Sequence, residues 1–279
     1  MKELMKKRTT AVIIVVSGIF FMLIFYLPTH SLVWNNISRL TNCNIEDTKK
    51  LPERFSVIIG HAYGQQDRQD DEGFIAPKVY EFLLKKQKSI NAVVFTGDVF
   101  NIPTSAKFNR LYSEFSRIKI FIAPGNHDVS RADSREVFNI SNAFFKEFPY
   151  LIKVEEFAII VEDSIKTGWN VDSRVAELLA LEHEHIIVAR HNVPIKELIT
   201  LANSSAGSEN LYDLEEFKSK VGILKQLTWV VGDGGNSEHH PRISCKEFEN
   251  HRFIINGIGE HPGDTILILT GGKYFQYQL

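Results

Sequence analysis

The sequence predicts an α/β domain in which two packed sheets have helices on their outer sides. Two observations lead to this prediction. From Phe55 onward, short apolar runs typical of buried strands alternate with segments of helical periodicity. From Thr228 to the C-terminus, strand patterns follow one another with few helices between them. An alternating first half and a strand-rich second half together favour two packed sheets.

The elements follow in a clear order. We predict strands at Phe55–Ile59, Ala92–Thr96, Ile118–Ala123, Tyr150–Val154, Phe157–Val161, His185–Ala189, Thr228–Val231, Phe253–Asn256, Thr265–Thr270 and Lys273–Tyr277. We predict helices at Pro77–Gln87, Lys107–Arg117, Ser134–Glu147, Val171–Glu182, Ile195–Leu201 and Asp213–Lys220. Pro77 suits the first turn of a helix, and Ser134 suits an N-cap. The pair Gly271-Gly272 suits the turn of a hairpin.

The first 33 residues have a different character. Four Lys or Arg side chains and one Glu occupy the first ten positions, and the apolar run 11–27 that follows contains no charge. As a helix this run would be roughly 25 Å long, close to the apolar thickness of a bilayer. We therefore expect residues 1–33 to form a cytoplasmic basic stub and one transmembrane helix. A cleaved signal peptide and a buried core helix are the alternatives.

This expectation sets the rest of the organisation. Residues 34–54 would be a stalk or linker, and residues 55–279 would form one domain, periplasmic or extracellular. The net charge of −2 does not favour nucleic acid as a partner. Cys43 and Cys245 are the two cysteines, and the sequence leaves open whether they pair or stay as free thiols.

Metal-capable side chains follow five of the predicted strands directly. In sheets of this kind, ligands gather at the carboxyl ends of the strands. The five groups are Gly60-His61-Ala62-Tyr63-Gly64, Gly97-Asp98, Gly125-Asn126-His127-Asp128, Arg190-His191-Asn192 and Gly232-Asp233-Gly234-Gly235. Taken singly, most of these groups are ordinary turns, caps or loop histidines. Together, their nitrogen and oxygen donors suit Mn²⁺, Fe²⁺ or Zn²⁺ rather than Ca²⁺.

In these residues the chain resembles the calcineurin-like metallophosphoesterases. The motifs of that family run Asp-x-His, Gly-Asp, Gly-Asn-His-Asp/Glu, a lone His and Gly-His-x-His. The second, third and fourth match at Gly97-Asp98, Gly125-Asn126-His127-Asp128 and His191. The resemblance covers most of residues 55–279 and implies an αββα four-layer sandwich of two mixed sheets flanked by helices.

The first and fifth motifs depart from the family pattern. His61 stands where the family has Asp, and Tyr63 stands where it has His. Asp233 replaces the first His of the fifth motif, and Gly235 replaces the second. His239 and His240 lie nearby as either substitute ligands or exposed loop residues.

The resemblance implies one or two divalent ions per chain. One ion would be held by Asp98, Asn126, His191 and Asp233, which is a full set of four. A second would keep the bridging Asp98 and His61, with Tyr63 as a weak phenolate-type ligand.

The resemblance also implies a mechanism, in which a metal-bound hydroxide attacks phosphorus. His127 would protonate the leaving oxygen, and Asp128 would orient the His127 ring. Tyr63 is a candidate substrate contact. Arg190 is another, although a surface position is the alternative for it.

The leading hypothesis is a membrane-anchored, metal-dependent hydrolase of a phosphomonoester, phosphodiester or pyrophosphate on a phosphorylated small molecule, sugar or lipid. The alternative is a non-catalytic, metal-stabilised binding domain of the cell envelope. A metal-dependent hydrolase of another ester is a third reading, which the altered motifs leave open.

Overall fold

The computed structural model describes residues 40–65, 74–143, 147–180, 185–202, 211–222, 226–234 and 243–279. The chain divides into two units, Met1–Thr41 and Asn42–Leu279, and the fold described below is that of the second unit.

The expected membrane location is corrected. Within the described ranges, no helix is both long enough and apolar enough to cross a bilayer. The apolar run 11–27, on which the expected anchor rested, lies outside the described residues.

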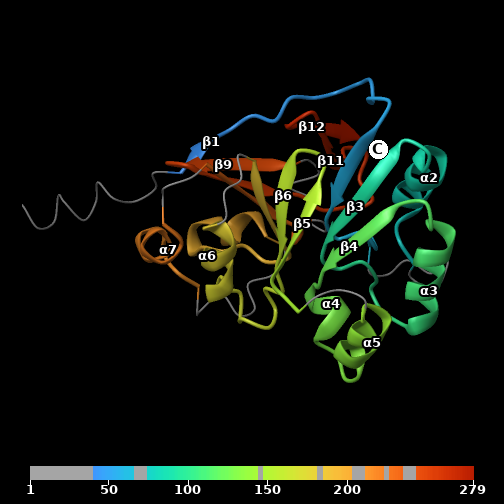
Figure 1. The fold of residues 1–279 in the computed structure, drawn as a ribbon, viewed down its shortest axis with the longest axis horizontal. Helices are drawn as coiled ribbons and strands as arrows, with labels where there is room; N and C mark the ends of the chain where they lie inside the picture. Colours follow the sequence, from blue (N-terminus) through green and yellow to red (C-terminus); the bar gives the residue numbers. More distant parts are fainter. Residues whose placement is uncertain are drawn as a thin grey trace, which may run out of the picture. The chain divides into compact units, whose positions relative to one another are not determined.

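Two mixed sheets form the centre of the domain (Figure 1). The five-stranded sheet has the order β12-β11-β2-β3-β4, and the seven-stranded sheet has the order β1-β9-β10-β8-β7-β6-β5. The strands of the first are β2 (Phe55–Ile59), β3 (Ile90–Thr96), β4 (Lys119–Ala123), β11 (Thr265–Thr270) and β12 (Lys273–Gln278). Those of the second are β1 (Thr41–Asn42), β5 (Tyr150–Val154), β6 (Phe157–Val161), β7 (Ile186–Arg190), β8 (Leu227–Val231), β9 (Ser244–Phe248) and β10 (His251–Ile255).

Each sheet combines neighbouring parallel strands with antiparallel strands, at one edge of the five-stranded sheet and at both edges of the seven-stranded sheet. Strands β2, β3 and β4 pair in parallel, and β11 joins β2 in the antiparallel sense. In the other sheet β6, β7, β8 and β10 are parallel neighbours, while β5 and β9 are antiparallel. The parallel strands therefore bring their carboxyl ends to the same edge within each sheet.

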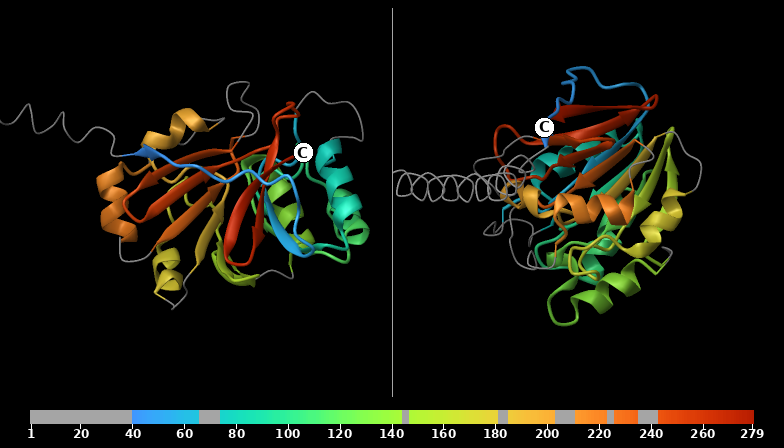
Figure 2. Two further views of the ribbon diagram at one scale, coloured as in Figure 1. Left: turned by 90° about the horizontal axis from the view of Figure 1, so that it is seen from above. Right: turned by 90° about the vertical axis from the view of Figure 1, so that its left-hand side faces the viewer.

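Helices flank both sheets, as predicted. They are α2 (Pro77–Lys86), α3 (Ser105–Glu114), α4 (Asn126–Val129), α5 (Ser134–Ser141), α6 (Ser173–Leu179), α7 (Leu214–Val221) and the 3₁₀ helix η2 (Lys196–Leu201). Helices α2 and α3 lie beside the five-stranded sheet, and α6 and α7 beside the seven-stranded one (Figures 1 and 2). The predicted α/β sandwich of two mixed sheets is confirmed.

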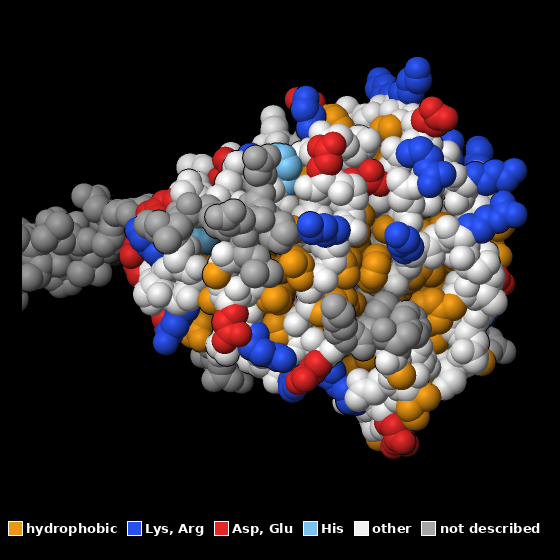
Figure 3. Space-filling model, viewed as in Figure 1, with side chains coloured by type: hydrophobic (Ala, Val, Ile, Leu, Met, Phe, Trp, Pro, Cys, Tyr) orange, Lys and Arg blue, Asp and Glu red, His pale blue; other side chains and the backbone are white. Residues whose placement is uncertain are grey.

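Helix ends follow from local chemistry. The side chains of Thr104 and Asp213 accept hydrogen bonds from backbone amides in the first turns of α3 and α7. Helix α5 starts at Ser134 as expected, but its N-cap is Asp133 in the left-handed region, with φ 65°. Lys and Arg side chains gather over α2, whose last turn contains Lys85 and Lys86 and so complements the helix dipole (Figure 3).

Strand β3 illustrates how the core is built. Val93 and Phe95 pack in the layer between the five-stranded sheet and its helices. Ala92 and Val94 point the opposite way, into the layer between the two sheets. Because both faces are covered, the stretch Ala92–Phe95 of this strand is apolar throughout and does not alternate.

The antiparallel strand β9 is not among the predicted elements. Its sequence, Ser-Cys-Lys-Glu-Phe, contains no apolar run and is only partly buried. Its strand conformation comes from pairing with β10, in which Cys245 lies opposite Ile254. The strand therefore forms because of its pairing with β10, which the local sequence does not reveal.

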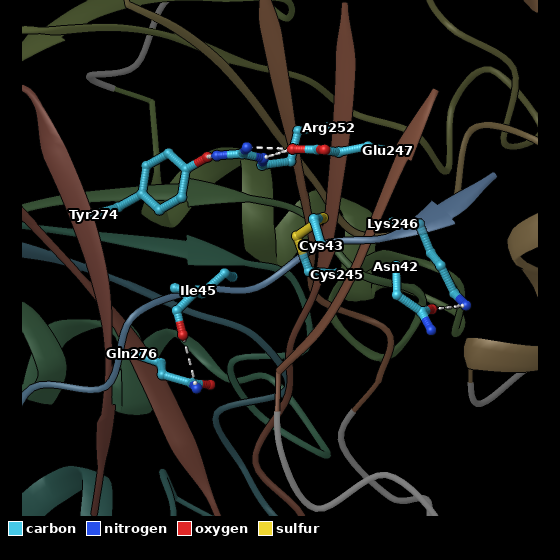
Figure 4. Close-up of a disulfide and its surroundings, with 9 residues drawn as sticks. All are labelled: Asn42, Cys43, Ile45, Cys245, Lys246, Glu247, Arg252, Tyr274 and Gln276. Atoms are coloured by element: carbon cyan, nitrogen blue, oxygen red, sulfur yellow. Dashed lines mark hydrogen bonds and ion pairs between the residues drawn. A yellow bond between two sulfur atoms is a disulfide. The ribbon is translucent and has the colours of Figure 1, made fainter. Parts of the chain in front are cut away.

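Segment 42–48, part of the expected linker, crosses from one sheet edge to the other (Figures 2 and 4). A disulfide joins Cys43 to Cys245 of β9, so of the two possibilities left open by the sequence the structure has the paired one. Backbone hydrogen bonds of 2.9 Å then tie Glu46 and Thr48 to Gln276 of β12. We call this segment the edge strap.

Candidate functional site

The polar groups predicted at strand ends come together where β2, β3, β4, β7 and β8 end. Glycines allow this close approach. A Cβ atom on Gly97 would lie 2.5 Å from Nδ1 of His191, and one on Gly125 would lie 2.2 Å from Oδ1 of Asp98. Backbone and side chains from both sheets therefore meet here with no room for larger residues.

The imidazole of His191 lies at the centre of this group. Its Nε2 is 2.8 Å from Oδ1 of Asn126, 3.5 Å from Oδ2 of Asp98 and 3.7 Å from Oδ1 of Asp233. Nε2 of His61 lies 3.8 Å from Oδ2 of Asp98. We refer to His61, Asp98, Asn126, His191 and Asp233 as the donor cluster. These are the five imidazole, carboxylate and amide side chains that the resemblance proposed as metal ligands.

Both histidine rings are oriented by backbone carbonyls. Nδ1 of His191 lies 3.2 Å from the Thr96 carbonyl oxygen, and Nδ1 of His61 lies 3.0 Å from that of Ile258. A carbonyl oxygen can only accept, so Nδ1 carries the proton in each ring. In the neutral rings, the lone pair on Nε2 then faces the cluster, which is the arrangement of a metal-ligating histidine.

The two rings differ in their electrostatics. Burial lowers the pKa of His61 to about 4, which outweighs the opposite effect of Asp98 and favours the neutral ring. Burial acts in the same direction on His191, but the carboxylates of Asp98 and Asp233 outweigh it and raise the pKa of that ring. The two carboxylates thus act together on His191 and favour its protonated form when no cation is bound.

The donor set fits a divalent metal ion by its chemistry. Two imidazole nitrogens, two carboxylates and one amide oxygen direct lone pairs toward one another, an arrangement that a cation stabilises. In the described part of the chain, no group of three or more His, Cys, Asp or Glu side chains is placed so that it could hold a metal ion. The fit therefore rests on the chemistry of the donor set, which includes the amide oxygen of Asn126.

The Asp128 side chain bonds to backbone amides of neighbouring turns. Its buried carboxylate accepts hydrogen bonds from the backbone amides of Asp98, Gly125 and Val99 at 2.8, 3.0 and 3.2 Å. Burial, reinforced by the charge of Asp98, raises its pKa to about 7. These contacts join the turns after β3 and β4, whereas the sequence led us to expect that Asp128 orients His127.

The ring of His127 is oriented by another group. Its Nδ1 lies 3.2 Å from the carbonyl oxygen of Asn101, and its backbone amide donates to Oδ1 of Asp98 at 2.9 Å. The half-buried ring packs beside Tyr63, with ring centroids 5.0 Å apart. Tyr63 is 1% exposed and also contacts the ring of His61, at 4.3 Å between centroids. Tyr63 therefore packs between the two histidines.

Arg190 does not face the site. Its side chain is 0% exposed and forms an ion pair of 3.1 Å with the equally buried Glu162. Its Nε donates to the Asn192 carbonyl at 2.8 Å, and Nη2 donates to that of Trp169. With its guanidinium enclosed by these partners, Arg190 is not available to bind a phosphate, and the prediction of a substrate contact is corrected.

Three further polar residues, not named as site residues from the sequence, are linked to the cluster by contacts that reach it through Asn192 and Asp233. They are Glu162, Ser164 and Asn192, all at most 1% exposed. The polar run Glu162-Asp163-Ser164 directly after the apolar strand Phe157–Val161 was the available signal. Gly235, His239 and His240 lie outside the described residues.

Comparisons with known proteins agree with this geometry. Residues 74–249 match the model of a protein family described as calcineurin-like phosphoesterase. No curated protein matches the sequence.

Two solved structures are similar over most of the chain. A purple acid phosphatase from yellow lupin (Lupinus luteus) seeds has 14% identity and a TM-score of 0.48, over 81% of this chain and 53% of the phosphatase. The chain thus spans about half the length of that enzyme. The phosphopantetheinyl hydrolase of Mycobacterium tuberculosis has 10% identity and a TM-score of 0.45, over 75% of this chain and 91% of the hydrolase. At these values neither likeness carries a conclusion about the reaction of this chain.

Proposed function

Because the chain belongs to the calcineurin-like phosphoesterase family, we propose that it hydrolyses a phosphomonoester, a phosphodiester or a pyrophosphate with the help of a divalent metal ion. The observation that carries this proposal is the convergence of three oxygen donors on Nε2 of one buried histidine. Those donors are at 2.8, 3.5 and 3.7 Å and come from three different loops.

The residues that would hold the ion are Asp98, Asn126, His191 and Asp233, with His61 beside Asp98. Mn²⁺, Fe²⁺ and Zn²⁺ suit this mixture of imidazole and oxygen donors. Such an ion supplies Lewis acidity, which lowers the pKa of water and neutralises charge on the phosphoryl oxygens. The carbonyls of Thr96 and Ile258 keep the two imidazoles in the tautomer that this role requires.

His127 is proposed as the general acid. With Nδ1 held by the Asn101 carbonyl, Nε2 is the atom that would give its proton to the leaving oxygen. Its backbone amide binds Asp98, so the acid and the donor cluster are linked through one turn. Tyr63, packed on the ring, restricts its rotation.

The test uses the full chain with its metal removed by a chelator and then replaced singly by Mn²⁺, Fe²⁺ or Zn²⁺. Bound metal and hydrolysis of p-nitrophenyl phosphate and bis-p-nitrophenyl phosphate are measured for each. We expect about one bound ion or more per chain and activity that returns with the ion. Less than one ion per chain, together with no turnover of either substrate, contradicts the proposal.

The role of His127 has a separate test. His127→Ala should lower kcat by about 10²–10⁴ on an alkyl phosphate, whose leaving group needs a proton. The loss on p-nitrophenyl phosphate should be much smaller, since nitrophenolate leaves without protonation. His185→Ala, at the exposed residue directly before β7, is the matched control. Equal losses on both substrates count against His127 as the acid.

A non-catalytic, metal-stabilised binding domain is the second candidate. The observation that favours it is Tyr63, an aromatic side chain packed against His61 where the family has a metal-binding histidine. The same experiment separates the two functions. Stoichiometric metal without turnover of any phosphoric ester supports the binding domain.

A further inference from the structure

The carboxylate of Asp233 faces two ways. Its Oδ1 lies 3.7 Å from Nε2 of His191, on the side of the donor cluster. Its Oδ2 accepts a hydrogen bond of 3.5 Å from Nδ2 of Asn192. Asp233 is 2% exposed, so water does not supply the contacts of this second oxygen freely. The position of the Asn192 amide therefore influences which oxygen Asp233 presents to the cluster.

Ser164 determines the orientation of that amide. The backbone N–H of Asn192 donates to Oγ of Ser164 at 3.1 Å, and Oγ is also 3.1 Å from Oδ1 of Asn192. Since the backbone N–H can only donate, the hydroxyl directs its single proton to Oδ1. Oδ1 is then the acceptor, and the NH₂ group is the end that points to Asp233. One buried hydroxyl thus defines the direction of the whole chain of hydrogen bonds.

The loop that carries Ser164 is itself held in place. Glu162, two residues before Ser164, donates its backbone N–H to the Ala189 carbonyl at 3.0 Å and so extends the β6–β7 pairing. Its side chain forms the buried ion pair with Arg190, and Arg190 in turn donates to the Asn192 carbonyl at 2.8 Å. The ion pair therefore fixes Ser164 and Asn192 relative to each other.

The turn of Asp233 is joined to the same framework. The backbone amides of Gly232 and Asp233 both donate to the His191 carbonyl at 3.1 Å. Backbone bonds thus place the Cα atom of Asp233, while the Asn192 amide acts on its carboxylate. The backbone bonds are part of the fold, whereas the bond from the Asn192 amide orients the carboxylate, as hydrogen bonds to metal ligands do.

We propose that Ser164 and Asn192 are positioning residues of the metal centre, forming a hydroxyl–amide relay that holds the Asp233 carboxylate in its ligating orientation. This inference rests on the proposed function, since it requires Asp233 to bind metal. It assigns to the loop after β6 a role that no family motif covers. Both residues would act through Asp233 and not as ligands themselves.

The test measures metal affinity on the full chain by competition of Mn²⁺ and Zn²⁺ with a chelator. Asn192→Ala and Ser164→Ala should each weaken binding by about 10–100-fold, as is typical when a partner of a metal ligand is removed. Thr167→Val is the matched control, because the Thr167 hydroxyl bonds to the Ser164 carbonyl in the same loop but not to Asn192. It should change the affinity by less than about two-fold.

A role in folding alone is separated by a mutant cycle. In the Asp233→Ala background, Asn192→Ala should have no further effect on metal affinity, because the group that it positions is gone. The melting temperature of each metal-free variant shows whether folding is retained. If Asn192→Ala does not fold, Asn192→Leu removes the donor with nearly the same shape and replaces it in the cycle.

The outcomes are distinct. A wild-type chain that binds metal while Asn192→Ala binds it equally well overturns the relay and leaves the proposed function standing. An equal loss of affinity with and without Asp233 also overturns it, because the effect then does not pass through that carboxylate. A wild-type chain that binds no metal overturns both the relay and the metal-dependent function.

Discussion

The middle and the edge of the sandwich join the two sheets by different means. In the middle, side chains at the ends of β3, β4, β7 and β8 contact one another in a cluster in which Asp98, His191 and Asp233 are buried and Asn126 is half-buried. At the edge, the strap of residues 42–48 links β9 to β12 through one disulfide and backbone bonds. Side chains there are half-exposed, as in the Arg252–Glu247 pair beside Tyr274 (Figure 4).

The contrast shows that the middle holds its side chains in a defined geometry, whereas the edge only attaches one sheet to the other. Each buried polar group in the middle needs a partner of defined geometry, so removal of one partner leaves another unsatisfied. At the edge, water can replace a polar contact that is lost, and the Cys43–Cys245 disulfide holds the strap to β9. Changes in the middle should therefore affect metal binding and stability together, while changes at the edge should affect stability alone.

The largest expected effect is that of Asp98→Ala in the middle. Asp98 lies within 4 Å of both cluster histidines and is 1% exposed, so its loss removes a shared ligand. Metal affinity should fall by more than about 100-fold, measured by chelator competition. Asp47→Ala in the edge strap is the control and should keep wild-type affinity. Comparable losses in the two variants would remove the distinction between middle and edge.

Next is the buried ion pair. Glu162→Gln or Arg190→Met alone should lower the free energy of unfolding by about 3–5 kcal/mol, because each leaves a buried charge uncompensated. The double variant Glu162→Leu/Arg190→Met should recover much of that loss, since apolar replacement of both charges is often neutral. Urea unfolding measures all three. A single-variant loss below about 1 kcal/mol would mean that water reaches the pair.

The disulfide should come third. Replacing both cysteines, Cys43→Ser/Cys245→Ser, should lower the free energy of unfolding by about 2–4 kcal/mol, since the bond closes a loop spanning 202 positions. Metal affinity should remain that of the wild type. A large loss of metal binding in this variant would show that the strap and the donor cluster are coupled.

The smallest effect is expected for the exposed pair at the edge. Arg252 and Glu247 are 28% and 33% exposed, so solvent screens their attraction. Arg252→Met should change the free energy of unfolding by no more than about 1 kcal/mol. The same urea experiment measures it beside Arg190→Met, an identical substitution in the middle. Equal values for the two arginines would contradict the comparison.

The sequence predicted most of the strands because their apolar runs are local. Phe55–Ile59, Tyr150–Val154, Phe157–Val161 and Thr265–Thr270 have the expected bounds. Strand β9 could not be predicted, because its conformation depends on pairing with β10. The predicted membrane location was wrong: the described residues contain no helix that could cross a bilayer.

The sequence by itself determined which residue types stand at the strand ends, since a strand pattern followed by glycine and a polar residue is readable along the chain. Together with the family resemblance, that was enough to name the five residues of the donor cluster. Only the tertiary structure decided the surroundings of each one. In that structure Asp128 accepts hydrogen bonds from backbone amides, and Arg190 forms an ion pair with Glu162. The partners of these buried polar groups come from loops that are distant in the sequence. The spacing of residues along the chain does not encode those partners.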